Sequence, residues 1–251
     1  RSFNDFSNIA FRGDSYETLE AYARKVETRV DEVTRVETRT IISSPDELAV
    51  ATLEGFIVTE DMLGNYSQTT YGRTAASRTV EEETDEIYTL RFVPKKLTRK
   101  VAAVLHIEGL NNIRSATCRL SGVAESIFLA TGKTSANTVT QEFTPSNPEF
   151  SPGSPFNGTL SCEFEIFGLN VIDNNNLHLD ALLVDGKTEF EGDCTNVKIT
   201  ENDDGTGSIT LILEASTEKV PDVKPEGGAG SGFDVDVDGW GNEINTDIPI
   251  N

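Results

Sequence analysis

Short segments in which apolar and polar residues alternate dominate the sequence. In the clearest one, Val101, Ala103, Leu105 and Ile107 share one side, and His106 lies on the other. Successive side chains of a β-strand point to opposite faces, so this pattern predicts a strand with one buried face. The same alternation occurs at residues 88–92, 118–120, 160–166, 177–183, 209–213 and 233–237. Gly, Pro, Asn and Asp separate these segments, which is typical of an antiparallel β-sandwich.

Other segments are harder to interpret. Apolar residues at helical spacing follow Asp14 and Ser15, with Glu17 placed as in a capping box, and predict a short helix from Ser15 to Val26. The stretch from Glu27 to Thr40 is compatible with a strand or an extended loop. We expect the Asn-, Pro- and Ser-rich stretch from Thr144 to Gly158 to be a loop between strands.

The charge balance excludes several classes of protein. Asp and Glu number 42 against 21 Lys and Arg, which gives a net charge of −21. Binding to nucleic acid or to an anionic membrane surface requires a basic patch, and this chain has none that stands out. No segment approaches the ~20 consecutive apolar residues of a membrane-spanning helix.

Candidate catalytic residues are few. Cys118, Cys162 and Cys194 lie far apart in the sequence without a Cys-x-x-Cys pair, although one disulfide among them is compatible with the sequence. His106 and His178 each lie in a predicted strand, with no Gly-x-Ser-x-Gly turn to present a nucleophile. Among 42 acids, pairs of carboxylates arise by chance. We therefore expect no catalytic residue, no cofactor-binding residue and no enzyme activity.

A segment near the end of the chain resembles the start of a calcium-binding loop, but two features argue against calcium binding. Asp234, Asp236, Asp238 and Gly239 begin like an EF-hand loop, but position twelve is Asn245 instead of Glu. Alternation along a strand also separates the three carboxylates by ~7 Å, which is too far for one cation. We expect no metal site here, and interpret the acids as a charged strand face that discourages edge pairing.

Three segments carry a resemblance to a known family: Phe11–Tyr22, Tyr88–Glu125 and Gly230–Gly241. With them the chain resembles an uncharacterised family of Bacteroidales surface lipoproteins, which is itself similar to the anchor and minor subunits of type V fimbriae, the FimB-like group. The resemblance covers most of residues 3–240.

The resemblance implies an all-β fold of tandem transthyretin-like antiparallel β-sandwich domains, at residues 1–87 and 88–251, with the one short helix. It also implies a lipid anchor in the outer membrane. No Cys lies near Arg1, so we expect the anchor to be absent from this chain and the first domain to be incomplete.

The same resemblance implies a non-catalytic fimbrial anchor or minor subunit, located at the cell surface or in the fimbrium and bound to pilin subunits by β-strand addition. Ile244, Ile248 and Ile250 alternate in a possible exchanged strand, although this segment is also compatible with a last strand of its own domain, since Pro249 lacks a donor. The alternative function is an outer-membrane glycan-binding accessory protein, which would require a concave site with exposed aromatic side chains.

Overall fold

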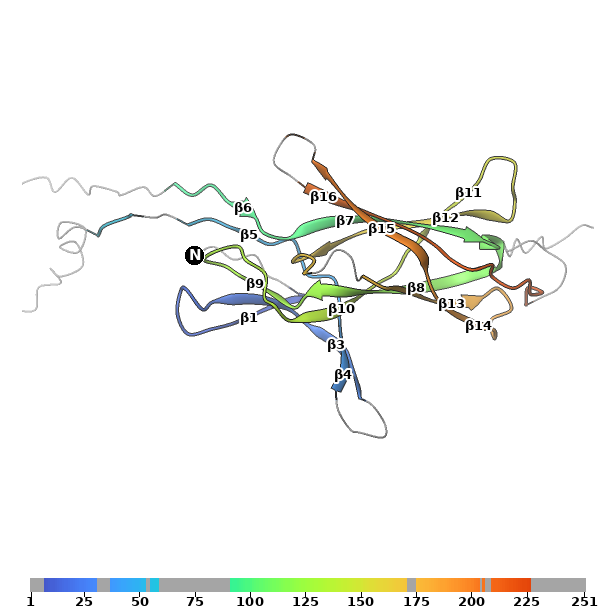
Figure 1. Cartoon of the computed structure of the whole chain (residues 1–251), viewed down its shortest axis with the longest axis horizontal. Coiled ribbons are helices and arrows are strands. Elements are labelled where there is room, and N and C mark those ends of the chain that lie inside the picture. The colour runs from blue at the N-terminus through green and yellow to red at the C-terminus, as the bar shows by residue number, and fades with distance from the viewer. Residues whose placement is uncertain are drawn as a thin grey trace, which may run out of the picture.

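The protein folds almost entirely into β-strands, as the alternating pattern predicts (Figure 1). Its structure, a computed structural model, describes residues 7–30, 37–52, 55–58, 91–170, 175–203, 205 and 209–226. Within these residues the helical structure is a single 3-10 turn, η1 (Leu110–Asn112). The all-β fold class is confirmed.

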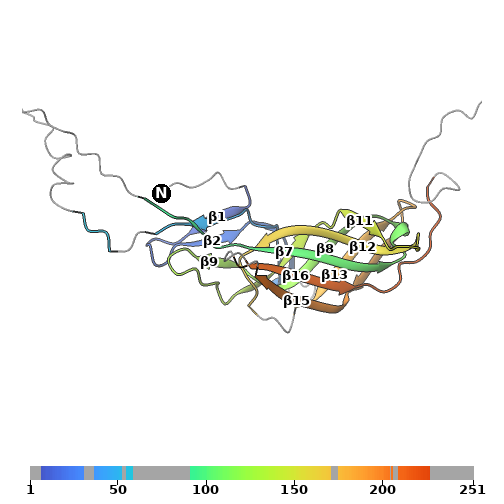
Figure 2. The same cartoon turned by 90° about the horizontal axis from the view of Figure 1, so that it is seen from above.

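Two large sheets form the body of the molecule, and Figure 1 shows them as two layers. The six-stranded sheet has the order β14 (Glu189–Asp193), β13 (Leu177–Leu183), β8 (Ile113–Ala124), β10 (Thr138–Phe143), β4 (Glu37–Ile42) and β3 (Lys25–Val30). The five-stranded sheet has the order β11 (Asn147–Phe150), β12 (Asn157–Ile166), β7 (Arg99–Glu108), β16 (Ile209–Ser216) and β15 (Thr195–Asp203), which lie side by side in Figure 2. Two small sheets complete the fold: β1 (Ile9–Arg12), β2 (Glu20–Ala23) and β9 (Ser126–Phe128) in one, β5 (Ala49–Val50) and β6 (Lys95–Lys96) in the other.

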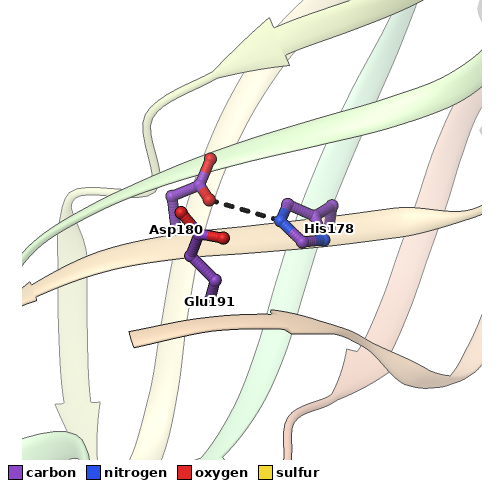
Figure 3. A group of neighbouring side chains, drawn as sticks. All are labelled: His178, Asp180 and Glu191. Atoms are coloured by element: carbon purple, nitrogen blue, oxygen red, sulfur yellow. Dashed lines mark ion pairs between the residues drawn. The ribbon is translucent and has the colours of Figure 1, made fainter. Parts of the chain in front are cut away.

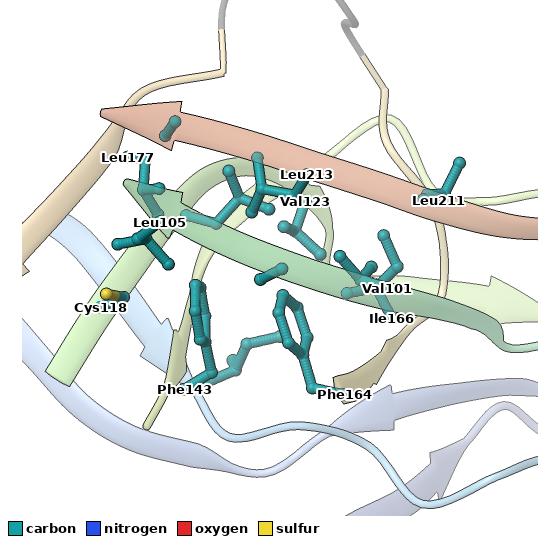
Figure 4. Packing of buried hydrophobic residues seen from close by; sticks show 14 of the residues in the cluster. Val101, Leu105, Cys118, Val123, Phe143, Phe164, Ile166, Leu177, Leu211 and Leu213 are labelled. Carbon is teal, nitrogen blue, oxygen red and sulfur yellow. The ribbon is translucent and has the colours of Figure 1, made fainter. Parts of the chain in front are cut away.

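The hydrophobic core lies between the two large sheets and is built from the alternating positions. Leu105 in β7, Leu179 in β13 and Leu213 in β16 have no exposed surface (Figure 4 shows part of the cluster). Phe143 of β10 stacks on Phe164 of β12 with ring centroids 4.3 Å apart, which joins one sheet to the other. Burial of each large apolar side chain stabilises the fold by about 1.5–3 kcal/mol, so this interface between the sheets is the main source of stability.

Most neighbouring strands are antiparallel, but two pairs are parallel. β10 pairs with β4, and β16 pairs with β7. Parallel strands cannot be joined by a tight turn and need a long connection. Here other strands of the fold form that connection. The sequence pattern contains no signal for strand direction, and the mostly antiparallel sheets are therefore mixed at these two pairs.

The predicted helix from Ser15 to Val26 is wrong. Ser15 and Thr18 instead form a turn, held by hydrogen bonds of their side chains to each other and to nearby backbone groups. Strand β2 follows, with Ala21 and Ala23 buried. Ser and Thr side chains that bond the local backbone favour turns over helices, and pairing of β2 with β9 then fixes the extended conformation.

One expected loop and one expected strand differ from the structure, and one segment that the sequence left open is a strand pair. The stretch from Thr144 to Gly158 contains β11, which pairs with β12. The backbone between Glu27 and Thr40, left open by the sequence, belongs to the β3–β4 hairpin where it is described. Of the strand predicted at residues 88–92, Arg91 and Phe92 are not in a strand, and Phe92 is 53% exposed. Residues 88–90 lie outside the described residues.

Strands from both sides of the predicted domain boundary share sheets. β2 pairs with β9, and β4 pairs with β10. Buried Ile9 and Ile42 belong to the same core cluster as the strands after residue 88. The boundary between 1–87 and 88–251 lies outside the described residues, and the division into two domains stays a prediction. Asp234, Asp236 and Asp238, with Ile244, Ile248 and Ile250, also lie outside the described residues.

Candidate functional site

The long edge strand β15 is the first candidate for a functional surface. It has nine residues and pairs on one side with β16, and among the described residues no strand pairs with its other side. Val197 and Ile199 point inward and pack partly against the core, whereas Lys198 and Thr200 are exposed. An unpaired edge of this kind offers backbone donors and acceptors to an incoming strand.

Two other edges of the large sheets, β11 and β14, are less suited to pairing. β11 has four residues and contains Pro148, which cannot donate a hydrogen bond. β14 carries Glu189, Glu191 and Asp193 over five residues. Proline and repeated charge both discourage edge-to-edge association, so β15 is the more open edge.

A groove of about 870 Å³ lies beside this edge. Its apolar lining includes Ile199 of β15, Ile209 and Leu211 of β16, and Phe167 after β12. At this end β13 begins opposite Leu120, and the last four residues of β8 have no β13 partner. The inner face of β15 and β16 is therefore only partly covered at this end.

Cationic side chains surround the groove in a chain of net charge −21. Lys96 donates hydrogen bonds to Glu165 (2.8 Å) and Glu47 (3.2 Å); burial lowers the pKa of Lys96, but these two carboxylates raise it by more. Lys95 and Lys133 are exposed and make no side-chain hydrogen bond or ion pair to any described residue. The ammonium groups of Lys95 and Lys133, without an ion pair to the described residues, thus lie at an apolar groove.

A second polar cluster lies on the outer face of the six-stranded sheet, where β13 and β14 form its edge. His178, Asp180 and Glu191 point toward one another (Figure 3), with one ligand atom from each within 4.8 Å of the others. His178 Nε2 lies 3.2 Å from Asp180 Oδ1, and His178 Nδ1 lies 2.8 Å from Asp193 Oδ1.

Arg119 of β8 anchors this cluster to the sheet. Its Nη1 donates to Asp180 Oδ2, and its Nε donates to Glu142 Oε2 at 3.0 Å. Only 13% of the Arg119 side chain is exposed, which holds its guanidinium in place. The cluster therefore combines one imidazole, four carboxylates and one guanidinium.

Sequence patterns place His178 on a predicted strand, but they do not predict that these residues form one cluster. The alternation of His178 with Asp180, and of Glu191 with Asp193, places each pair on one strand face. The register of the β13–β14 hairpin, which pairs His178 with Asp193 and Asp180 with Glu191, is what joins the two pairs. His106 is exposed on β7 and, among the described residues, has no side-chain hydrogen bond or ion pair.

The three cysteines are free thiols in the structure. Burial, with a further contribution from the other two thiols, raises the pKa of Cys118. Burial and then Glu163 raise the pKa of Cys162 to about 11, and burial and then Asp193 raise that of Cys194 to about 11. Thiols in this state are poor nucleophiles, since the thiolate is the reactive form.

The packed sheets and the open edge define an all-β protein whose most accessible features are strand edges and a groove. The model of the family described as "Domain of unknown function (DUF5119)" matches residues 2–144, more than half of the chain. The chain belongs to this family.

Among solved structures, the chain is similar to a protein described as a "putative adhesin" from Bacteroides ovatus ATCC 8483. Sequence identity is 16% and the TM-score is 0.45, over 75% of this chain and 61% of that one, so the chain spans less than two thirds of its neighbour's length. No curated protein matches the sequence. Among the described residues, no helix has the length and apolar character needed to cross a bilayer.

Proposed function

We propose that this chain is a non-catalytic cell-surface protein, an anchor or minor subunit of a type V fimbria, that acts by protein–protein contact and β-strand addition. A lipid anchor attaches it to the outer membrane, and pilin subunits are its partners. It uses no cofactor.

The observation that carries this proposal is that the edge of β15, which has no partner among the described residues, lies beside an apolar groove. An incoming strand bonded to the backbone of β15 would place alternate side chains beside the inward-facing Ile199, at the apolar groove that Ile209 and Leu211 of β16 also line. Lys95 and Lys133 at the rim favour a strand with acidic side chains on its other face. Hydrogen bonds between the two backbones give the affinity, and side chains held in the groove fix the register of the incoming strand.

The chain also contains a segment suited to the opposite role. Ile244, Ile248 and Ile250 present apolar side chains that could enter a groove of a neighbouring subunit. In this proposal one subunit accepts a strand at β15 and donates a strand from its C-terminal segment, which allows addition in a fixed order.

Two variants of adjacent residues on β15 test the groove. Ile199→Lys places a charge in the apolar lining, whereas Thr200→Lys places the same charge on the exposed face of the same strand. We expect affinity purification from the cell surface to recover pilin subunits with the wild type and with Thr200→Lys, and at least tenfold less pilin with Ile199→Lys. Circular dichroism checks that both variants fold. Equal recovery with both variants, or no pilin with the wild type, would contradict the proposal.

One observation favours the alternative, a glycan-binding accessory protein. A depression of about 570 Å³ at the other end of the sandwich is lined by Phe150, Leu110, Arg114 and three prolines, and Phe150 is 39% exposed. If polysaccharide is recovered in place of pilin, and Phe150→Ala abolishes that recovery, the glycan-binding function replaces the fimbrial one.

A further inference from the structure

The cluster on the outer face of β13 and β14 has the chemistry of a metal site, independently of the groove at β15. His178 and Asp180 are two residues apart on β13 and project from the face opposite the core, and Glu191 faces them from β14. In Figure 3 the imidazole and the two carboxylates converge. One nitrogen and two oxygens within 4.8 Å of one another are a set that a single cation can bridge.

The hydrogen bond on the far side of the ring determines which nitrogen is available. His178 Nδ1 lies 2.8 Å from the carboxylate of Asp193, so Nδ1 carries the proton that it donates. When the ring is neutral, Nε2 presents a lone pair 3.2 Å from the acceptor Asp180 Oδ1. Two lone pairs at this distance repel unless a cation lies between them.

The local charge also favours a cation of charge greater than one. Asp180, Glu191 and Asp193 contribute three negative charges around the ring. Arg119 is the nearby positive group, and it is shared between Asp180 and Glu142. A proton on His178 would leave the cluster with excess negative charge, and a divalent ion compensates it more fully.

The ligand set and its spacing point to one class of metal. Imidazole with carboxylates suits zinc and neighbouring first-row ions, whereas calcium and magnesium prefer oxygen ligands alone. Tetrahedral bonds of about 2.0–2.2 Å place ligand atoms about 3.3–3.6 Å apart. The 3.2 Å between Nε2 and Asp180 Oδ1 is close to this spacing, and the exposed Glu191 has room to move inward.

The surrounding residues provide the outer shell that metal sites use. Metal-bound histidines commonly donate their other N–H to a carboxylate, which is the contact of His178 with Asp193. Bound carboxylates are themselves hydrogen-bonded, as Asp180 is by Arg119 through its other oxygen.

We propose that His178, Asp180 and Glu191 bind a zinc-class divalent cation, with a fourth position open to water. The ion cross-links β13 to β14 at the edge of the six-stranded sheet. This site is separate from strand addition at β15 and goes beyond the proposed function.

Titration of the metal-free full chain with zinc chloride, followed by calorimetry, tests the site. We expect one equivalent to bind the wild type, no binding at this site in His178→Ala, and at least tenfold weaker binding in Glu191→Gln. Asp193→Asn, which alters only the outer shell, should weaken binding about 10–100-fold. His106→Ala is the matched control, because it removes the exposed histidine of β7, and it should bind as the wild type does.

Cobalt chloride provides a second readout that separates this site from the thiols. Cobalt bound by imidazole and carboxylates gives visible ligand-field bands without the near-ultraviolet charge-transfer band of a cobalt–thiolate bond. We expect the first signal in the wild type and its loss in His178→Ala. A thiolate band, equal zinc binding by His178→Ala, or no binding by the wild type would overturn the proposal; the last result would show that His178 forms only ion pairs.

Discussion

Replacement of Phe164 by alanine tests the claim that two sheets are held together by one core. Phe164 on β12 is 7% exposed, and Phe143 on β10, against which it stacks, is 6% exposed. Truncation of a buried Phe to Ala typically costs about 3–5 kcal/mol, and a stacked aromatic pair contributes about 0.5–1.5 kcal/mol beyond its buried area. We expect each single variant to lose about 3–5 kcal/mol of unfolding free energy. The double variant should lose about 0.5–1.5 kcal/mol less than the sum of the two single losses.

Urea denaturation followed by fluorescence or circular dichroism measures these differences at constant m-value. Phe156→Ala is the control, because Phe156 is 59% exposed and its loss should change stability by less than about 0.5 kcal/mol. If Phe164→Ala costs no more than Phe156→Ala, the core does not lie where the two sheets meet. If the losses at Phe143 and Phe164 are strictly additive, the two rings do not stack.

Three further predictions concern the reactivity of two thiols, the loss of stability at low pH, and the effect of replacing two glycines. With pKa values of about 11, Cys162 and Cys194 should react with iodoacetamide at pH 8 at least roughly a hundredfold more slowly in the folded protein than in urea; equal rates would contradict their burial. Burial raises the pKa of Glu20, but hydrogen bonds from two side chains lower this pKa below its usual value. The stabilisation of the fold by the Glu20 carboxylate is therefore present above about pH 4.5 and is lost as the pH falls further. The stability difference between wild type and Glu20→Gln, measured in urea, should therefore shrink between pH 6 and pH 3, and a constant difference would refute this. Gly158→Ala would place Cβ 2.2 Å from a carbonyl oxygen of β11 and should lower the melting temperature, whereas Gly192→Ala, whose Cβ meets nothing closer than 3.7 Å, should not.

Much of the fold followed from alternation alone. Leu105, Leu120, Leu179 and Leu213 were each assigned to an apolar strand face, and all four are fully buried. The prediction succeeds there because a strand covered on one face imposes a strict period of two on its sequence. Nothing in that period specifies which strands become neighbours, and so the parallel pairs of β4 with β10 and of β7 with β16 were not foreseen.

The failures have a common physical origin in contacts distant in sequence. Tyr16, Leu19, Ala23 and Val26 have helical spacing, yet β2 is extended because it pairs with β9, about a hundred residues later. The segment Asn147–Phe150 has turn-forming neighbours and a proline, yet it becomes β11 because β12 offers it an edge. Local preferences were weak in both segments, and tertiary pairing overrode them.

Both candidate sites arise from one feature of the chain path, the passage from β14 to β15. A single residue, Cys194, separates two strands that belong to different sheets. Asn196 has a positive φ of 53°, and the register of β15 against β16 shifts between Thr195 and Lys198. Asn tolerates this backbone conformation, and irregular pairing of this kind lets a strand turn from one sheet into the other.

This passage explains why the groove and the polar cluster lie where they do. Beyond the corner, β15 continues along the five-stranded sheet, and its inward Ile199 lies at the groove. Before the corner, Asp193 is the last residue of β14 and holds the ring of His178. A cation that ties β13 to β14 would therefore fix the point from which the accepting edge begins, so the outer-face cluster has a structural role even though it lies outside the groove.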